Sequence, residues 1–122
     1  MEWADEGVVL GAKSHGETNV VVELFTKDHG RHFGLLHGGR SRKKSPIVQC
    51  GNLVNLTWKA RLSEQLGYLT LELKTCFSVH AMEDPPALAA LTSLCCLLRL
   101  LPERDPHLVL YDITLLFLSY LN

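Results

Sequence analysis

Apolar residues recur with two different periods along this chain of 122 residues, and the change between them constrains the fold more than any other feature. Over residues 7–79, apolar and polar side chains alternate, as they do on a strand with one buried face. Beyond Asp84-Pro85-Pro86 the apolar residues recur every three or four positions, which is typical of helices. Strands are therefore predicted first, and helices after them.

Glycine-containing turns divide the alternating region into five predicted strands, at residues 7–13, 19–27, 31–37, 54–62 and 68–79. Five antiparallel strands in an open sheet would leave two edges free to pair with other chains, and closure into a barrel removes those edges. A five-stranded, partly open barrel is the OB architecture, and residues 38–51 supply its longer connection between the third and fourth strands. We predict a mainly β chain with such a barrel, followed by two α-helices.

The two predicted helices have clear start signals, Asp84-Pro85 for the first and Asp105-Pro106 for the second. Both are apolar almost all round, so they need partners on several sides. We expect residues 1–80 to form the OB domain and residues 81–122 to begin a truncated helical domain. Missing sequence, the barrel or self-association through residues 108–121 would then cover the apolar faces. The alternative is a natural two-helix extension that packs on the barrel.

Charge is divided unevenly along the chain. The 12 Lys and Arg residues nearly balance the 13 Asp and Glu residues, which gives a net charge of −1 and no global attraction to a polyanion. Residues 1–80 hold 10 of the basic and 8 of the acidic side chains, whereas residues 81–122 hold 2 and 5. Binding of a polyanion therefore requires a local cluster of cations in the barrel.

Such a cluster occurs in the connection, as Gly38-Gly39-Arg40-Ser41-Arg42-Lys43-Lys44-Ser45. Cations flanked by glycines and hydroxyls suit phosphate oxygens, so Arg40, Arg42, Lys43 and Lys44 are candidate DNA-binding residues. The alternative is a solvated loop that keeps the barrel in solution.

Three further cations, Lys59, Arg61 and Lys74, are predicted on the polar faces of the fourth and fifth strands. They would extend the positive surface across the sheet. Alternatively, Glu72 neutralises them across the hairpin formed around residues 63–67.

The sequence gives little support for a catalytic site or a metal site. The loop matches a phosphate-binding P-loop at Gly38, Lys44 and Ser45, but it lacks the second glycine, and Pro46 obstructs the helix that should follow. The candidate metal ligands, His29, His32, His37 and Cys50, fail because strand alternation places His32 and His37 on opposite faces of the sheet. We expect no catalytic residues, no metal and no cofactor.

Two tryptophans receive different predictions. Trp58 has the parity of a core residue, and Trp3 is a weak candidate for stacking on a base.

The cysteines and the N-terminus indicate the compartment. The four cysteines form no C-x-x-C pair and are expected to be free thiols, and the N-terminus lacks the basic and apolar segments of a signal peptide. The longest apolar runs are shorter than the roughly 20 residues of a membrane span. We expect a cytoplasmic chain with no membrane partner.

The combination of short motifs resembles the N-terminal half of the bacterial RecO family. The resemblance spans residues 2 to about 80, and the motifs that carry it are Glu6-Gly7-Val8-Val9-Leu10, Gly16-Glu17-Thr18-Asn19, Leu24-Phe25-Thr26, Gly30-Arg31, Gly38-Gly39-Arg40-Ser41-Arg42, Gly51-Asn52 and Trp58-Lys59-Ala60-Arg61-Leu62.

The resemblance implies a nucleoid-associated recombination mediator of the RecF-type DNA repair pathway. Such a protein binds single- and double-stranded DNA, anneals strands and assists RecA loading together with RecR and the single-strand-binding protein SSB. Arg40 and Arg42 fall on the family motif, whereas Lys43 and Lys44 are inferred from charge alone. Many members carry a cysteine zinc motif that this chain lacks, so zinc is not expected. The alternative function is a protein-interaction module that docks RecR or SSB with little DNA contact of its own.

Overall fold

The computed structural model describes residues 1–62 and 65–121. Five strands precede three helices, in the order β1 (Glu2–His15), β2 (Asn19–Thr26), β3 (Gly30–Leu36), β4 (Leu53–Lys59), β5 (Tyr68–Thr75), α1 (Phe77–Met82), α2 (Pro85–Leu98) and α3 (Leu108–Tyr120). Part of the turn predicted at residues 63–67 lies outside the described residues.

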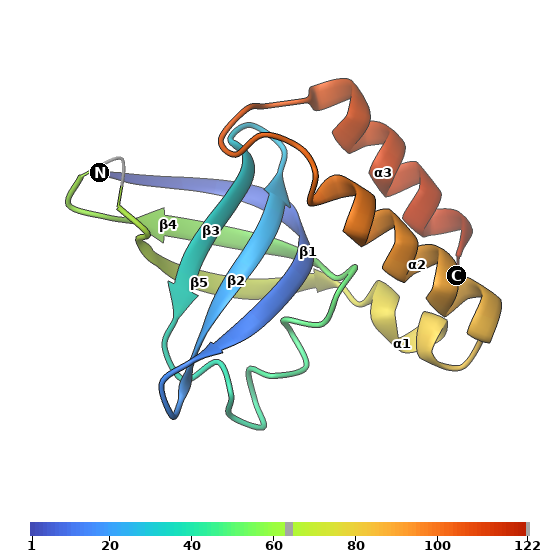
Figure 1. Ribbon diagram of the computed structural model, residues 1–122, viewed down its shortest axis with the longest axis horizontal. Coiled ribbons are helices and arrows are strands. Elements are labelled where there is room, and N and C mark those ends of the chain that lie inside the picture. The colour runs from blue at the N-terminus through green and yellow to red at the C-terminus, as the bar shows by residue number, and fades with distance from the viewer. Residues whose placement is uncertain (63–64, 122) are drawn as a thin grey trace.

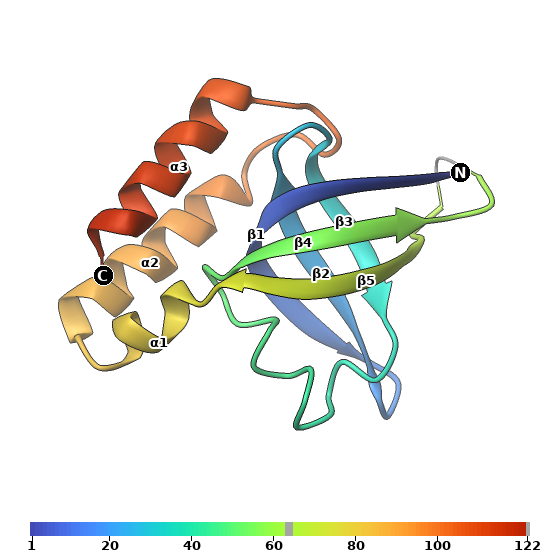
Figure 2. The same cartoon turned by 180° about the vertical axis from the view of Figure 1, so that it is seen from behind.

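The five strands close into a barrel in the order β1-β2-β3-β5-β4 (Figures 1 and 2). The long β1 pairs antiparallel with β2 over one half and with β4 over the other, and its register shifts between Val9 and Gly11. Strands β3 and β5 are parallel and pair only at Leu35 and Tyr68. The barrel closes through this single bridge, which we call the seam. The prediction of a mainly β chain with a five-stranded barrel before helices is confirmed.

Three predicted strand boundaries are wrong by three residues or more, and one of them is the end of the fourth strand, since β4 ends at Lys59 instead of residue 62. Strand β1 begins at Glu2 instead of residue 7, because its first residues pair with β4, Glu2 opposite Lys59. The fifth strand ends at Thr75 instead of residue 79, and α1 takes up the remainder, which makes three helices instead of two. A buried side chain from outside this segment ends the strand: the Oδ1 atom of Asn52 accepts a hydrogen bond from the Ser78 backbone N–H at 3.0 Å.

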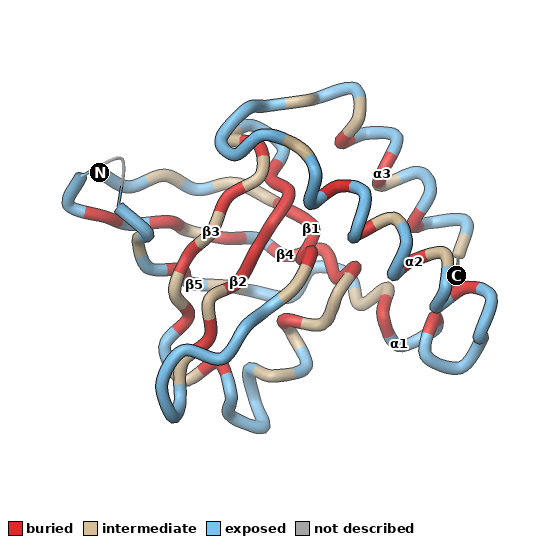
Figure 3. The backbone as a smooth tube through the Cα atoms, in the orientation of Figure 1, coloured by how far each residue is buried: buried red, intermediate tan, exposed pale blue. Residues whose placement is uncertain are grey.

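The buried residues form two clusters, one inside the barrel and one between the barrel and the helices (Figure 3). Val22, Leu24 and Trp58 belong to the interior cluster, which agrees with the core position predicted for Trp58. The outer cluster combines strand residues with residues of all three helices: Val8, Leu10, Phe25, Leu53, Ala81, Ala87, Leu91, Cys95, Leu98, Tyr111 and Leu118. The helices therefore pack on the outside of the barrel, beside β1 and β2 (Figure 1).

The helices keep a large apolar surface exposed even so. Leu97, Val109 and Tyr120 are among its members. Within the described ranges, no helix is both long and apolar enough to cross a membrane.

Candidate nucleic-acid interface

The connection between β3 and β4, residues 37–52, begins beside the turn between β1 and β2 and ends against α2, where a Cβ atom on Gly51 would lie 2.4 Å from the Cδ1 atom of Leu91 (Figures 1 and 2). Three hydrogen bonds from Arg40 join the connection to this turn, one of them from the guanidinium group to the Gly16 carbonyl at 3.4 Å. Its backbone N–H donates to the Thr18 carbonyl at 3.1 Å, and its guanidinium group donates to the Glu17 carbonyl at 3.0 Å. The loop therefore holds a defined shape although it contains no strand.

Local steric requirements explain the paired glycines at the start of this loop. Gly38 adopts a φ of +66°, which disfavours other residues, and its N–H is accepted by the Asn19 Oδ1 atom at 3.0 Å. A Cβ atom on Gly39 would lie 2.3 Å from the Cγ2 atom of Val20, so only glycine fits against the barrel there. The Gly-Gly pair thus places Arg40 where it meets the β1–β2 turn.

The other end of the loop is fastened by Asn52, which is completely buried. Its side-chain amide donates to the carbonyl groups of Pro46 at 3.1 Å and Ile47 at 3.4 Å, while its Oδ1 atom accepts the Ser78 N–H. One amide therefore fixes both the loop and the start of α1.

All four loop cations, Arg40, Arg42, Lys43 and Lys44, are exposed. None of the four forms an ion pair with a carboxylate in the described part of the chain. Lys44 donates from Nζ to the His37 carbonyl at 2.8 Å, so it and Arg40 are oriented by neutral carbonyl groups. Because these contacts leave the positive charges uncompensated, the loop attracts anions.

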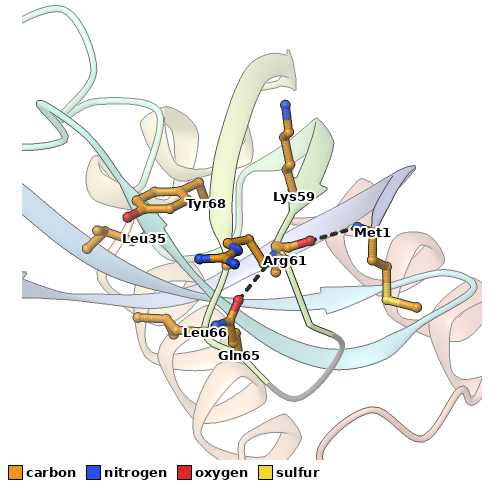
Figure 4. A pocket seen from close by; sticks show the side chains of 9 residues that line it. Met1, Leu35, Lys59, Arg61, Gln65, Leu66 and Tyr68 are labelled. Atoms are coloured by element: carbon orange, nitrogen blue, oxygen red, sulfur yellow. Dashed lines mark hydrogen bonds between the residues drawn. The ribbon is translucent and has the colours of Figure 1, made fainter.

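Lys59 and Arg61 lie elsewhere, in a cleft of about 640 Å³ where β3 and β4 end and β5 begins (Figure 4). The other lining residues are mainly apolar: Met1, Leu35, Ala60, Gln65, Leu66, Gly67 and Tyr68. Glu2 is the cross-strand neighbour of Lys59, yet no ion pair joins the two.

A stacked pair of rings connects the loop to the cleft. The imidazole of His37 packs on the ring of Tyr68 with centroids 4.9 Å apart and planes 16° apart. His37 also supplies the carbonyl that binds Lys44, and Tyr68 lines the cleft. The loop cations and the cleft cations therefore belong to one surface, which crosses the seam between β3 and β5.

Lys74 is the exception among the predicted site residues. It lies near the other end of β5, and its Nζ atom is 3.7 Å from the Oε2 atom of Glu6. Tyr111 of α3 donates its hydroxyl group to the same carboxylate at 3.1 Å. The structure thus brings six of the seven cations toward one surface and places Lys74 beside the helices, with Glu6 instead of Glu72 as its ion-pair partner.

The aromatic rings near the N-terminus pack against one another. Trp3 stacks on His29 at 3.7 Å between centroids and on Trp58 at 5.4 Å, so protein rings already cover it and the structure does not favour Trp3 as a base-stacking residue. His32 is buried, whereas His37, one residue past the end of β3, is exposed, so the two side chains do not share a site. Among the described residues, no three His, Cys, Asp or Glu side chains gather as a metal site.

Two more arginines share one carboxylate. Arg31 and Arg99 both bind the buried carboxylate of Glu23, and the distance from Arg99 Nε to Glu23 Oε1 is 2.9 Å. This triad ties β2 and β3 to the C-terminal end of α2.

Sequence reasoning missed Tyr68 and His37 as site residues. The alternation of β5 does place Tyr68 on the outer face together with Thr70 and Glu72, and an exposed aromatic ring on a polar strand face is a signal that the sequence offered. The contact with His37 depends on closure of the barrel.

Known proteins match this chain along its whole length. The family model described as "Recombination protein O N terminal" matches residues 1–77. DNA repair protein RecO of Methylorubrum extorquens strain PA1 is 48% identical over all 122 residues, and that of Methylobacterium nodulans is 50% identical. RecO of Brucella abortus strain 2308 is 46% identical. The matches cover 100% of this chain and 50%, 50% and 49% of the three relatives, so the chain spans about half of their length.

Proposed function

Because this chain belongs to the RecO family of DNA repair and recombination proteins, we propose that it is a DNA-binding recombination mediator that acts without catalysing a bond change. In this proposal it binds single- and double-stranded DNA and anneals complementary strands. With RecR and SSB as partners at the nucleoid, it assists RecA loading.

The observation that carries the proposal is the set of four exposed loop cations that form no ion pair with any described carboxylate, on a loop held in shape by Arg40 and Asn52. Such cations bind phosphate groups through charge, whatever the base sequence. Annealing requires two polyanions to approach, and neutralisation of their phosphates lowers the repulsion between them. No bond is formed or broken, so the proposal needs no nucleophile, general base or ATP site.

A single-charge exchange tests this proposal. We expect Lys43→Gln to weaken DNA binding several-fold, by a similar factor on unrelated sequences, because a phosphate contact carries no sequence information. It should also slow the annealing of two labelled complementary oligonucleotides. Lys27→Gln is the matched control, because Lys27 is also exposed but lies in the β2–β3 turn at the opposite end of the barrel (Figure 1). Equal effects of the two variants would contradict the proposal.

The exposed apolar faces of α2 and α3 favour a second candidate function, a protein-interaction module that docks RecR or SSB. In that case DNA contacts would lie mainly in the half of the relatives' length that this chain does not span. Titration with an oligonucleotide at low and high salt discriminates the two candidates, since only the DNA-binding module gives salt-dependent binding of its own.

A further inference from the structure

The cleft where β3 and β4 end and β5 begins combines an apolar interior with positive charge at its margin. In Figure 4, Leu35, Leu66 and Tyr68 lie on one side, and Lys59 lies on the other, with Arg61 between them. A flat apolar group with an attached anion matches this lining, because the ring would be removed from water while the anion meets the cations.

Tyr68 supplies the aromatic surface of the cleft. Its residue surface is 54% exposed even though His37 stacks against the ring, so much of the tyrosine remains available to a ligand. The His37 contact holds the ring, and the pairing of Tyr68 with Leu35 across the seam fixes the backbone that carries it, before any ligand arrives. A fixed ring loses little conformational entropy when a second ring stacks on it.

The cleft also lies on the route that a strand would follow from the cationic loop. Lys44 binds the carbonyl of His37, and His37 packs on Tyr68, so the loop and the cleft are adjacent. A polynucleotide held by its phosphates on the loop would bring its bases to Tyr68, with Lys59 and Arg61 placed for the next phosphates.

We propose that this cleft binds an unpaired nucleobase of single-stranded DNA, stacked on Tyr68, while Lys59 and Arg61 contact the adjoining phosphates. This inference rests on the DNA-binding function proposed above and adds a preference to it. In a duplex the faces of each base are covered by neighbouring base pairs, so a stacking site accepts single strands and not duplex DNA.

The test measures the affinity of three nucleic acids for the full chain and for its Tyr68→Leu variant. The probes are an oligothymidylate, an abasic strand with the same number of phosphates, and a duplex of matched charge. We expect Tyr68→Leu to weaken oligothymidylate binding at least about fivefold, since a base stacked on an aromatic side chain contributes about that much or more. Binding of the abasic strand and of the duplex should stay unchanged.

Two variants serve as controls. Tyr68→Phe keeps the stacking ring and should retain oligothymidylate affinity, whereas Tyr120→Leu removes a tyrosine that is 80% exposed on α3, outside the proposed surface, and should change nothing. Circular dichroism of each variant verifies folding. If Tyr68→Leu behaves like Tyr120→Leu while Lys43→Gln still weakens binding, the base site is wrong and the DNA-binding proposal stands. If Lys43→Gln also has no effect, both fail.

Discussion

At the scale of single residues, His32 shows how burial sets a side chain's chemistry. It lies inside the barrel with 6% of its surface exposed, against the rings of Trp3 and Trp58. Its Nδ1 atom is 3.3 Å from the His29 carbonyl, and its Nε2 atom has no hydrogen-bond partner. Desolvation disfavours the charged imidazolium and lowers the pKa of His32 from 6.5 to about 4.

This pKa makes stability depend on pH. Between pH 6.5 and about 4 the unfolded chain binds a proton at this site that the folded chain does not bind, so folding loses stability as pH falls through that window. We expect His32 to account for a loss of about 2 kcal/mol between pH 7 and pH 5.

Urea denaturation at both pH values measures this contribution. The loss should be absent in His32→Phe and present in His15→Gln, which replaces an exposed histidine. An unchanged pH dependence in His32→Phe would assign the effect to other groups.

At the scale of elements, the local sequence pattern predicted which segments are strands better than it predicted where those strands end. The alternation around Val54, Leu56 and Trp58 identified β4, because one of its faces meets the core and the other meets water. Because Phe77 and Val79 continue the same alternation, the fifth strand was predicted to include them, whereas the chain is helical there. That change depends on a hydrogen bond that the Ser78 N–H donates to Asn52, 26 positions away, and a contact over this separation leaves no mark in a local period.

Asn52 is accordingly the residue whose loss should matter most for these elements. Asn52→Ala leaves the Ser78 N–H and the carbonyl groups of Pro46 and Ile47 without their partner, so we expect the free energy of unfolding to fall by about 2 to 4 kcal/mol. Asn55→Ala, at an exposed position of β4, should change it by less than about 0.5 kcal/mol. Equal losses, measured by urea denaturation, would show that the buried amide does not fasten the loop.

The candidate site was predictable to the extent that it is local. Arg40, Arg42, Lys43 and Lys44 are close in sequence, so their charge density is visible without a structure. The stacked pair of His37 and Tyr68 comes from strands that meet only when the barrel closes, and their single parallel bridge has no periodic signal.

At the scale of the whole molecule, the helices and the candidate cationic surface lie on different sides of the barrel. The helices cover the outside of β1 and β2, where Phe25 and Tyr111 pack together with ring centroids 5.6 Å apart. The six cations of the candidate surface lie on the connecting loop (Arg40, Arg42, Lys43 and Lys44) and in the cleft beside the seam of β3 and β5 (Lys59 and Arg61). The barrel can therefore support the helices and present a cationic surface at the same time.

The dependence of DNA affinity on salt tests the central claim most directly. With about four phosphates neutralised on a single strand, the logarithm of the affinity should fall against the logarithm of salt concentration with a slope of roughly −3. Replacement of Arg40, Arg42, Lys43 and Lys44 by alanine should flatten the slope while the chain stays folded, since exposed charges contribute little to stability. An unchanged slope and affinity in the folded quadruple variant would contradict the account.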